Sequence, residues 1–174
     1  DYVSRDVAGI PLIAVRGLDG KIRAFKNACR HRGVQLAHGH GCARVLVCPY
    51  HGWAYSLDGS LRNIPHEHGF PDVDKATRGL VPVACAEING LVFINQDPQA
   101  DINNDVSSLP KLMPDGHRLL RSDNMVIKAN WKLYIESALE GYHIRETHKD
   151  TFFPVQYDNL TVVETFGENS RVTF

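Results

Sequence analysis

The stretch C-R-H-R-G at Cys29–Gly33 is followed by C-P-Y-H-G-W at Cys48–Trp53, and these two stretches decide how the chain folds. Residues 32–47, sixteen in all, separate His31 from Cys48, so the pattern is C-x-H, a sixteen-residue gap and C-x-x-H. Each stretch offers one thiol and one imidazole with a glycine close behind. Two tight loops that each pair unlike ligands predict a metal centre held between the loops.

The division of ligands suits a [2Fe–2S] cluster in which Cys29 and Cys48 bind one iron and His31 and His51 bind the other. The following glycines would let backbone amides approach the cluster. A structural Cys₂His₂ zinc site is the alternative, because it uses the same ligand types. Zinc fingers pair like ligands in sequence, whereas unlike ligands are paired here, so the spacing favours iron–sulfur.

The sequence around these loops predicts an antiparallel β domain. Asp19-Gly20, Asp58-Gly59 and Asn89-Gly90 are turn signals that each lie between two short apolar runs. The predicted hairpin strands are 11–15 with 21–25, 53–57 with 60–64, and 84–88 with 91–95. Three hairpins within the first 95 residues indicate a small barrel or sandwich. The remaining cysteines, Cys42 and Cys85, are interpreted as small buried hydrophobes.

The composition changes after residue 97. Residues 98–122 are rich in Asp, Asn, Ser and Pro and are predicted to be a linker. Residues 125–129 are a candidate strand, and apolar residues with a 3.6-residue period predict a helix over 131–144, capped by Asn130. Residues 160–166 and 171–174 are predicted strands. The predicted domains are therefore 1–97 and 123–174.

Composition excludes several classes of protein. Among 174 residues, 43% are hydrophobic, 22% are charged, and the net charge is −1. No basic excess exists to bind nucleic acid, and no apolar stretch is long enough to span a bilayer. The chain begins without a signal peptide and without Met, and both ends lie in strand-like sequence, so we expect a cytoplasmic protein of which this chain is a fragment.

The two ligand stretches resemble those of Rieske proteins, whose fold is a small antiparallel β domain with the cluster at its tip. Respiratory Rieske proteins carry a disulfide between the loops, at positions that are Val34 and Tyr50 here. They also have a Ser where this chain has Trp53. The resemblance therefore implies the branch without the disulfide, with a cluster potential near the low end of the Rieske range.

A second group of candidate residues lies in the predicted helix. Glu136, Glu140 and His143 are spaced i, i+4, i+7 and share one helical face. His148 follows His143 by five residues, which on a regular helix would make the two rings diverge by about 140°. One metal ion could be shared only if the helix breaks or bulges between Tyr142 and His148, and we predict such a break.

Residues 130–148 resemble the iron-binding segment of Rieske non-haem iron oxygenases, the ring-hydroxylating oxygenase α-subunits. The resemblance implies that His143 and His148 bind a mononuclear Fe(II), with a third carboxylate ligand beyond this chain. It also implies that Glu140 bridges this iron to the cluster of a neighbouring subunit, pointing away from its own metal. Most members have Asp at the bridge. With Glu140 at that position, this chain resembles the branch that acts on quaternary ammonium compounds such as carnitine and betaine.

The implied fold class is α+β, an antiparallel β Rieske [2Fe–2S] domain followed by the truncated start of a helix-on-sheet catalytic domain. The implied enzyme is a mono- or dioxygenase that uses O₂ to hydroxylate a small organic substrate. Electrons would come from NAD(P)H through a separate reductase or ferredoxin, because no G-x-G-x-x-G motif is present. A homotrimer or another homo-oligomer is implied. The alternative is a Rieske-type ferredoxin that only carries electrons, which leaves residues 130–148 without a purpose.

Overall fold

The computed structural model describes all residues except 112–115, 119, 157, 159 and 168. It divides into two compact units, Asp1–Ser107 and Ser108–Phe174. No helix in the described part of the chain is long and apolar enough to cross a membrane.

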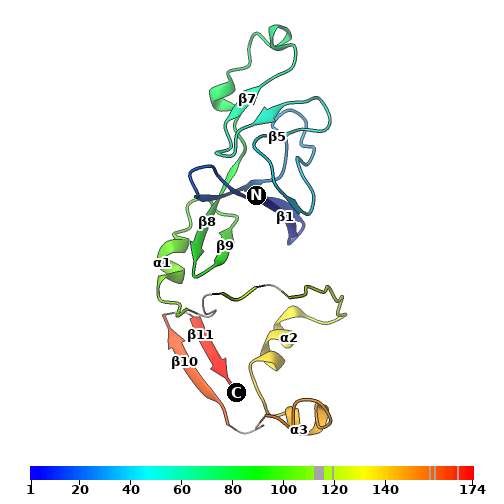
Figure 1. Cartoon of the computed structure of the whole chain (residues 1–174), viewed down its shortest axis with the longest axis vertical. Coiled ribbons are helices and arrows are strands. Elements are labelled where there is room, and N and C mark those ends of the chain that lie inside the picture. The colour runs from blue at the N-terminus through cyan, green and yellow to red at the C-terminus, as the bar shows by residue number, and fades with distance from the viewer. Residues whose placement is uncertain (112–115, 119, 157, 159, 168) are drawn as a thin grey trace. The chain divides into compact units, whose positions relative to one another are not determined.

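Unit 1 is built from two antiparallel sheets (Figure 1). The larger sheet has the strand order β4-β1-β2-β3-β8-β9 and the smaller one the order β5-β6-β7. The strands of the larger sheet are β1 (Tyr2–Val7), β2 (Ile10–Arg16), β3 (Ile22–Lys26), β4 (His40–Gly41), β8 (Pro82–Ile88) and β9 (Leu91–Asn95). Those of the smaller sheet are β5 (Leu46–Val47), β6 (Ala54–Tyr55) and β7 (Leu61–Asn63). Two 3₁₀ turns, η1 (Glu67–Gly69) and η2 (Lys75–Thr77), lie between β7 and β8.

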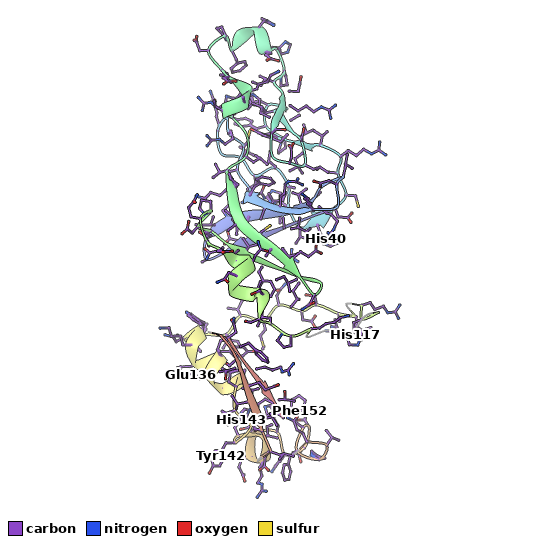
Figure 2. The ribbon with its side chains drawn as sticks, turned by 90° about the vertical axis from the view of Figure 1, so that its left-hand side faces the viewer. His40, His117, Glu136, Tyr142, His143 and Phe152 are labelled. Atoms are coloured by element: carbon purple, nitrogen blue, oxygen red, sulfur yellow. The ribbon has the colours of Figure 1, made fainter. Side chains whose placement is uncertain are left out.

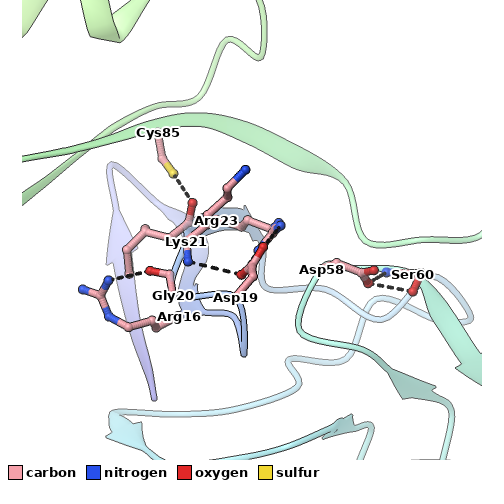
Figure 3. Close-up of polar contacts among 9 residues, drawn as sticks. Arg16, Asp19, Gly20, Lys21, Arg23, Asp58, Ser60 and Cys85 are labelled. Atoms are coloured by element: carbon pink, nitrogen blue, oxygen red, sulfur yellow. Dashed lines mark hydrogen bonds and ion pairs between the residues drawn. The ribbon is translucent and has the colours of Figure 1, made fainter.

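The three predicted hairpins are confirmed as β2–β3, β6–β7 and β8–β9. Their turns are stabilised locally, as Figure 3 shows for the first two: the Asp19 carboxylate accepts from the Lys21 amide, and the Asp58 carboxylate accepts from the Ser60 amide and hydroxyl. Asn89 and Gly90 both have positive φ, 52° and 82°, which a tight hairpin turn of this kind requires.

The main core of unit 1 combines residues from both sheets and includes both candidate cluster cysteines. Its fully buried members include Ile13 and Tyr55, and Cys29 and Cys48 are only 4% and 3% exposed. Cys42 does not follow the prediction. It is exposed and its thiol donates to the Asp1 carboxylate at 2.6 Å, because it precedes the core strand β5 in a surface loop.

The segment predicted to be a linker contains a short helix, α1 (Ile102–Ser107). Ile102 and Val106, four residues apart on one face, are buried, and the helix contacts β8 and β9. Asp101 accepts a hydrogen bond from the Asn104 amide at the helix start. The predicted domain limits at residues 97 and 122 stay predictions, and residues 112–115 and 119 lie outside the described part.

Unit 2 contains α2 (Trp131–Ala138), α3 (Ile144–Thr147) and an antiparallel pair, β10 (Val162–Phe166) and β11 (Asn169–Thr173). The Asn130 side chain accepts from the Lys132 amide at 3.0 Å, which confirms the predicted cap. The predicted strand over 125–129 is wrong, since these residues form no regular element and are all exposed. The predicted helix ends at Ala138 rather than at residue 144.

Candidate functional site

The two candidate cluster loops have the same backbone hydrogen bonds. The Gly33 amide donates to the Cys29 carbonyl at 2.8 Å, and the Gly52 amide donates to the Cys48 carbonyl at 3.0 Å. Each cysteine amide also donates to the carbonyl of the residue that follows the glycine. Cys29 donates to Val34 and Cys48 donates to Trp53, both at 2.8 Å. The glycines have φ of 75° and 73°, a conformation that other residues rarely adopt. Two short sequences with one cysteine and one glycine each thus fold into matching loops.

Tyr55 links the first loop to strand β6. Its phenol oxygen lies 3.3 Å from the Cys29 sulfur and accepts a hydrogen bond from the Arg30 amide at 2.9 Å. With the Arg30 amide as donor, the phenol proton is free to point at the sulfur. Burial, followed by the contact with Cys29, raises the pKa of Tyr55, which keeps it protonated as a donor. The sequence pattern did not single out Tyr55, although its position two residues after Trp53 could have indicated it.

The sulfur atoms lie in a dry environment. Burial is the main cause of a raised pKa for the Cys29 thiol, and the nearby Cys48 sulfur raises it further. A buried thiol such as that of Cys29 resists ionisation unless a positive ion compensates the thiolate charge. The arrangement therefore suits cysteines that are metal ligands.

The imidazoles of the two loops lie next to each other, with ring centroids 4.7 Å apart. His31 stacks on Trp53 at 5.0 Å with an interplanar angle of 8°, whereas His51 is exposed beside Tyr50. The Nδ1 atom of His31 is buried and has no hydrogen-bond partner. Burial, and then His51, lower the pKa of His31. A neutral imidazole with an inward, unpartnered nitrogen is what a metal ligand requires.

The donor set fits an iron–sulfur cluster better than zinc. Zinc would draw all four donors to within about 2.0–2.3 Å of one point. In the described residues, which include both loops, no three Cys, His, Asp or Glu side chains gather around a position for a single ion. A cluster spreads its ligands over two irons, so two neighbouring thiols on one side and two neighbouring imidazoles on the other suffice.

The second group of candidate residues lies around the turn between α2 and α3 (Figure 2). His143 and His148 occupy the two caps of α3, and their ring centroids are 5.3 Å apart with the rings at 64°. The helix is interrupted at residues 139–143, so the break begins earlier than predicted and overlaps the predicted stretch, Tyr142 to His148, only at Tyr142 and His143. The Thr147 amide donates to the His143 carbonyl at 2.8 Å and the His148 amide to the Ile144 carbonyl at 2.9 Å, so the two rings meet across a single helical turn.

Gly141 allows this turn to close. A Cβ atom there would lie 3.0 Å from the Phe174 ring and 3.2 Å from the Asp158 carbonyl oxygen, too close for another residue without rearrangement. The Ile144 amide then donates to the Gly141 carbonyl at 3.0 Å, and α3 begins.

The Glu140 carboxylate contacts its own chain's His143. Its Oε1 lies 2.5 Å from Nδ1 of His143, and its Oε2 accepts from the amides of Tyr142 and His143 at 2.5 and 3.3 Å. The hydrogen bond with His143 is the main reason that the pKa of Glu140 is lowered. A proton on Nδ1 is thereby favoured, which leaves Nε2 of His143 as the nitrogen available to a metal.

A cavity of about 470 Å³ lies against these residues. Glu140 and both histidines line it, together with Tyr134, Phe152 and Phe174. Two imidazoles on an aromatic-lined cavity match two of the three protein ligands that a 2-His-1-carboxylate iron site requires. No further carboxylate in the described part of unit 2 completes a three-ligand group.

Comparison with known proteins also separates the cluster-loop region from the region of the two histidines. Residues 1–83 match the family model of the Rieske [2Fe-2S] domain, and residues 114–173 match that of the ring hydroxylating alpha subunit (catalytic domain). The carnitine monooxygenase oxygenase subunit of Escherichia coli (strain K12) is 36% identical over 192 residues, covering 100% of this chain and 51% of that protein. The glycine betaine monooxygenase oxygenase subunit of Chromohalobacter salexigens is 36% identical over 166 residues, covering 91% of this chain and 37% of that protein.

Solved structures give the same result. A quaternary ammonium Rieske monooxygenase in complex with an inhibitor matches with a TM-score of 0.85 and 31% identity, over 95% of this chain and 47% of that one. Naphthalene 1,2-dioxygenase with indole bound matches with a TM-score of 0.74 and 30% identity, over 89% and 38%. The chain spans about half the length of the carnitine monooxygenase oxygenase subunit that it matches over its whole length. It belongs to the Rieske oxygenase family, as the part of an α-subunit that holds the Rieske domain and the start of the catalytic domain.

Proposed function

We propose that the full-length protein is the terminal oxygenase component of a Rieske system. In this chain Cys29, His31, Cys48 and His51 hold the [2Fe–2S] cluster, and His143 and His148 supply two of the three ligands to a mononuclear Fe(II). When bound, the cluster supplies single electrons and the iron activates O₂ for hydroxylation of a small organic substrate.

The protein's own residues prepare both centres. Tyr55 donates toward the Cys29 sulfur, and the burial of Cys29 and Cys48 keeps water away from their sulfur atoms. Glu140 holds His143 in the tautomer that leaves Nε2 available, and its carboxylate is the group that would meet a neighbouring subunit's cluster domain. The single observation that carries the proposal is the Glu140–His143 pair opposite His148 on one cavity. An electron carrier has no use for that arrangement.

We further propose a quaternary ammonium substrate of the carnitine or betaine type, because the relatives named for these compounds cover most of this chain. Tyr134, Phe152 and Phe174 on the cavity supply aromatic surface that suits a trimethylammonium group. Electrons would come from NAD(P)H through a separate reductase or ferredoxin. The α-subunits would form a homotrimer or another homo-oligomer in the cytoplasm, bound to neither nucleic acid nor membrane.

The test uses the full-length protein purified with its metals. Rieske-type EPR and about three irons per chain are expected for the oxygenase, against about two for a carrier. Carnitine, glycine betaine and anthranilate are then each supplied with O₂ and a chemically reduced cluster, and hydroxylated product is measured. Product from a quaternary ammonium compound supports the whole proposal. Product from anthranilate alone refutes the substrate, and two irons without product refute the oxygenase.

A further inference from the structure

The two cluster loops have matching hydrogen bonds but different support. The second loop is the turn of a β-hairpin: directly outside Cys48 and Trp53, Val47 pairs with Ala54, and Leu46 pairs with Tyr55. The backbone ladder therefore holds both of its ends. The first loop has no such ladder. Strand β3 ends at Lys26, and the residues after Val34 form no strand until β4 at His40.

A side chain takes the place of the missing ladder. Asn27 lies two residues before Cys29 and is 0% exposed. Its Oδ1 accepts from the Leu36 amide at 2.8 Å, and its Nδ2 donates to the Ala37 carbonyl at 2.7 Å. One primary amide thus binds an amide N–H and a carbonyl on the far side of the loop, as a paired strand would. Only this orientation of the amide satisfies both backbone groups.

The same side chain ties the loop to the large sheet. The side-chain Nδ2 of Asn27 also donates to the Ser4 hydroxyl on β1 at 2.8 Å. The backbone amide of Asn27 donates to the Pro11 carbonyl at 2.8 Å. The Ser4 amide in turn donates to the Gly39 carbonyl. Every polar group of the Asn27 side chain is therefore used, and a buried polar group that is fully satisfied specifies one conformation.

We infer that Asn27 is the positioning residue of the first cluster loop, which fixes where Cys29 and His31 stand relative to the second loop. It acts through the backbone of Leu36 and Ala37 and touches no ligand atom. The inference rests on the cluster assignment in the proposed function.

The test uses the full-length, cluster-loaded protein with the substitutions Asn27→Asp and Ser4→Ala. Asn27→Asp has nearly the same shape but replaces the donor that faces the Ala37 carbonyl with an oxygen. Ser4→Ala removes only the partner outside the loop. We expect Asn27→Asp to shift or broaden the EPR spectrum of the reduced cluster and to shorten the half-life of the cluster absorbance by about tenfold, as loss of a buried hydrogen bond implies. Ser4→Ala should retain the wild-type EPR spectrum.

A purely structural role predicts a different result: a lower melting temperature for Asn27→Asp with an unchanged EPR spectrum and cluster half-life. That outcome overturns the inference, and so does an equal effect of the two substitutions. Should Asn27→Asp not fold, hydrogen exchange of the wild-type protein decides, because the Leu36 amide must be protected if Asn27 holds it; rapid exchange there refutes the inference. Absence of any Rieske EPR signal in the wild-type protein would instead refute the cluster assignment.

Discussion

The Glu140 carboxylate and the His143 imidazole form a pair with Oε1 2.5 Å from Nδ1, at the turn where α2 has ended and α3 begins. The other oxygen, Oε2, accepts from two backbone amides of the same turn. Glu140 thus both shapes the turn and orients a candidate iron ligand. The expected link to a neighbouring subunit's cluster stays a prediction.

Glu140→Gln is expected to leave both metal centres loaded and to lower turnover by about 10–100-fold, the usual effect of removing a carboxylate behind a metal-bound histidine. The amide retains the shape of the side chain but loses the charge that favours a proton on Nδ1 of His143. Iron content and the rate at which the reduced cluster is reoxidised by O₂ with substrate measure the effect. Glu136→Gln, on an exposed position of α2, is the matched control. Wild-type turnover in Glu140→Gln would remove Glu140 from the mechanism.

Cys48→Ala is expected to abolish the reddish-brown colour and the Rieske EPR signal of the purified protein, because one iron loses a thiolate ligand. Cys42→Ala should retain both, since Cys42 is exposed and its thiol donates to the Asp1 carboxylate. Visible absorbance and EPR of the two variants check this. A retained signal in Cys48→Ala contradicts the ligand assignment.

Tyr55→Phe is expected to lower the midpoint potential of the cluster. The phenol donates toward the Cys29 sulfur, and a donor stabilises the more negative, reduced state. A hydrogen bond to a charged group of about 1.5 kcal/mol corresponds to about 60 mV for one electron. Redox titration monitored by EPR measures the shift. Tyr50→Phe, which changes an exposed phenol, should leave the potential unchanged, and an equal shift in both variants would contradict the role of Tyr55.

Unit 1 is expected to lose stability in acid through the Arg16–Glu87 pair. Arg16 on β2 reaches across β3 to bind both Glu87 oxygens, at 2.9 and 2.6 Å, and this lowers the pKa of Glu87 below its ordinary 4.5. A carboxylate whose pKa is lower in the folded state stabilises the fold fully above pH 4.5. This stabilisation is lost as the pH falls through the pKa that the carboxylate has in the folded state. Wild type should therefore exceed Glu87→Gln in denaturant midpoint near pH 7, and the difference should vanish in acid. A difference independent of pH would exclude the ion pair as its cause.

The sequence alone determined the features that depend on neighbouring residues. The Asp-Gly and Asn-Gly turns place three hairpins, because their backbone conformation is set within two residues. The C-x-H and C-x-x-H spacing places the ligand loops, and Asn130 marks the start of α2 through a contact two residues away. Each of these signals is local, so no knowledge of the fold was needed to interpret it.

Only the tertiary structure decided what depends on distant residues. Tyr55 meets Cys29, and Asn27 meets Ser4, across gaps of 26 and 23 residues that no local pattern encodes. The helical pattern is interrupted at residues 139–143, where Gly141 lies close to Phe174 and Asp158, and these contacts exist only once the second unit has folded. Helical periodicity continues through residues 139–143 in the sequence, but these contacts override it. His143 and His148 meet across the single turn of α3, whose two caps they occupy, and this sets the shape of the candidate iron site.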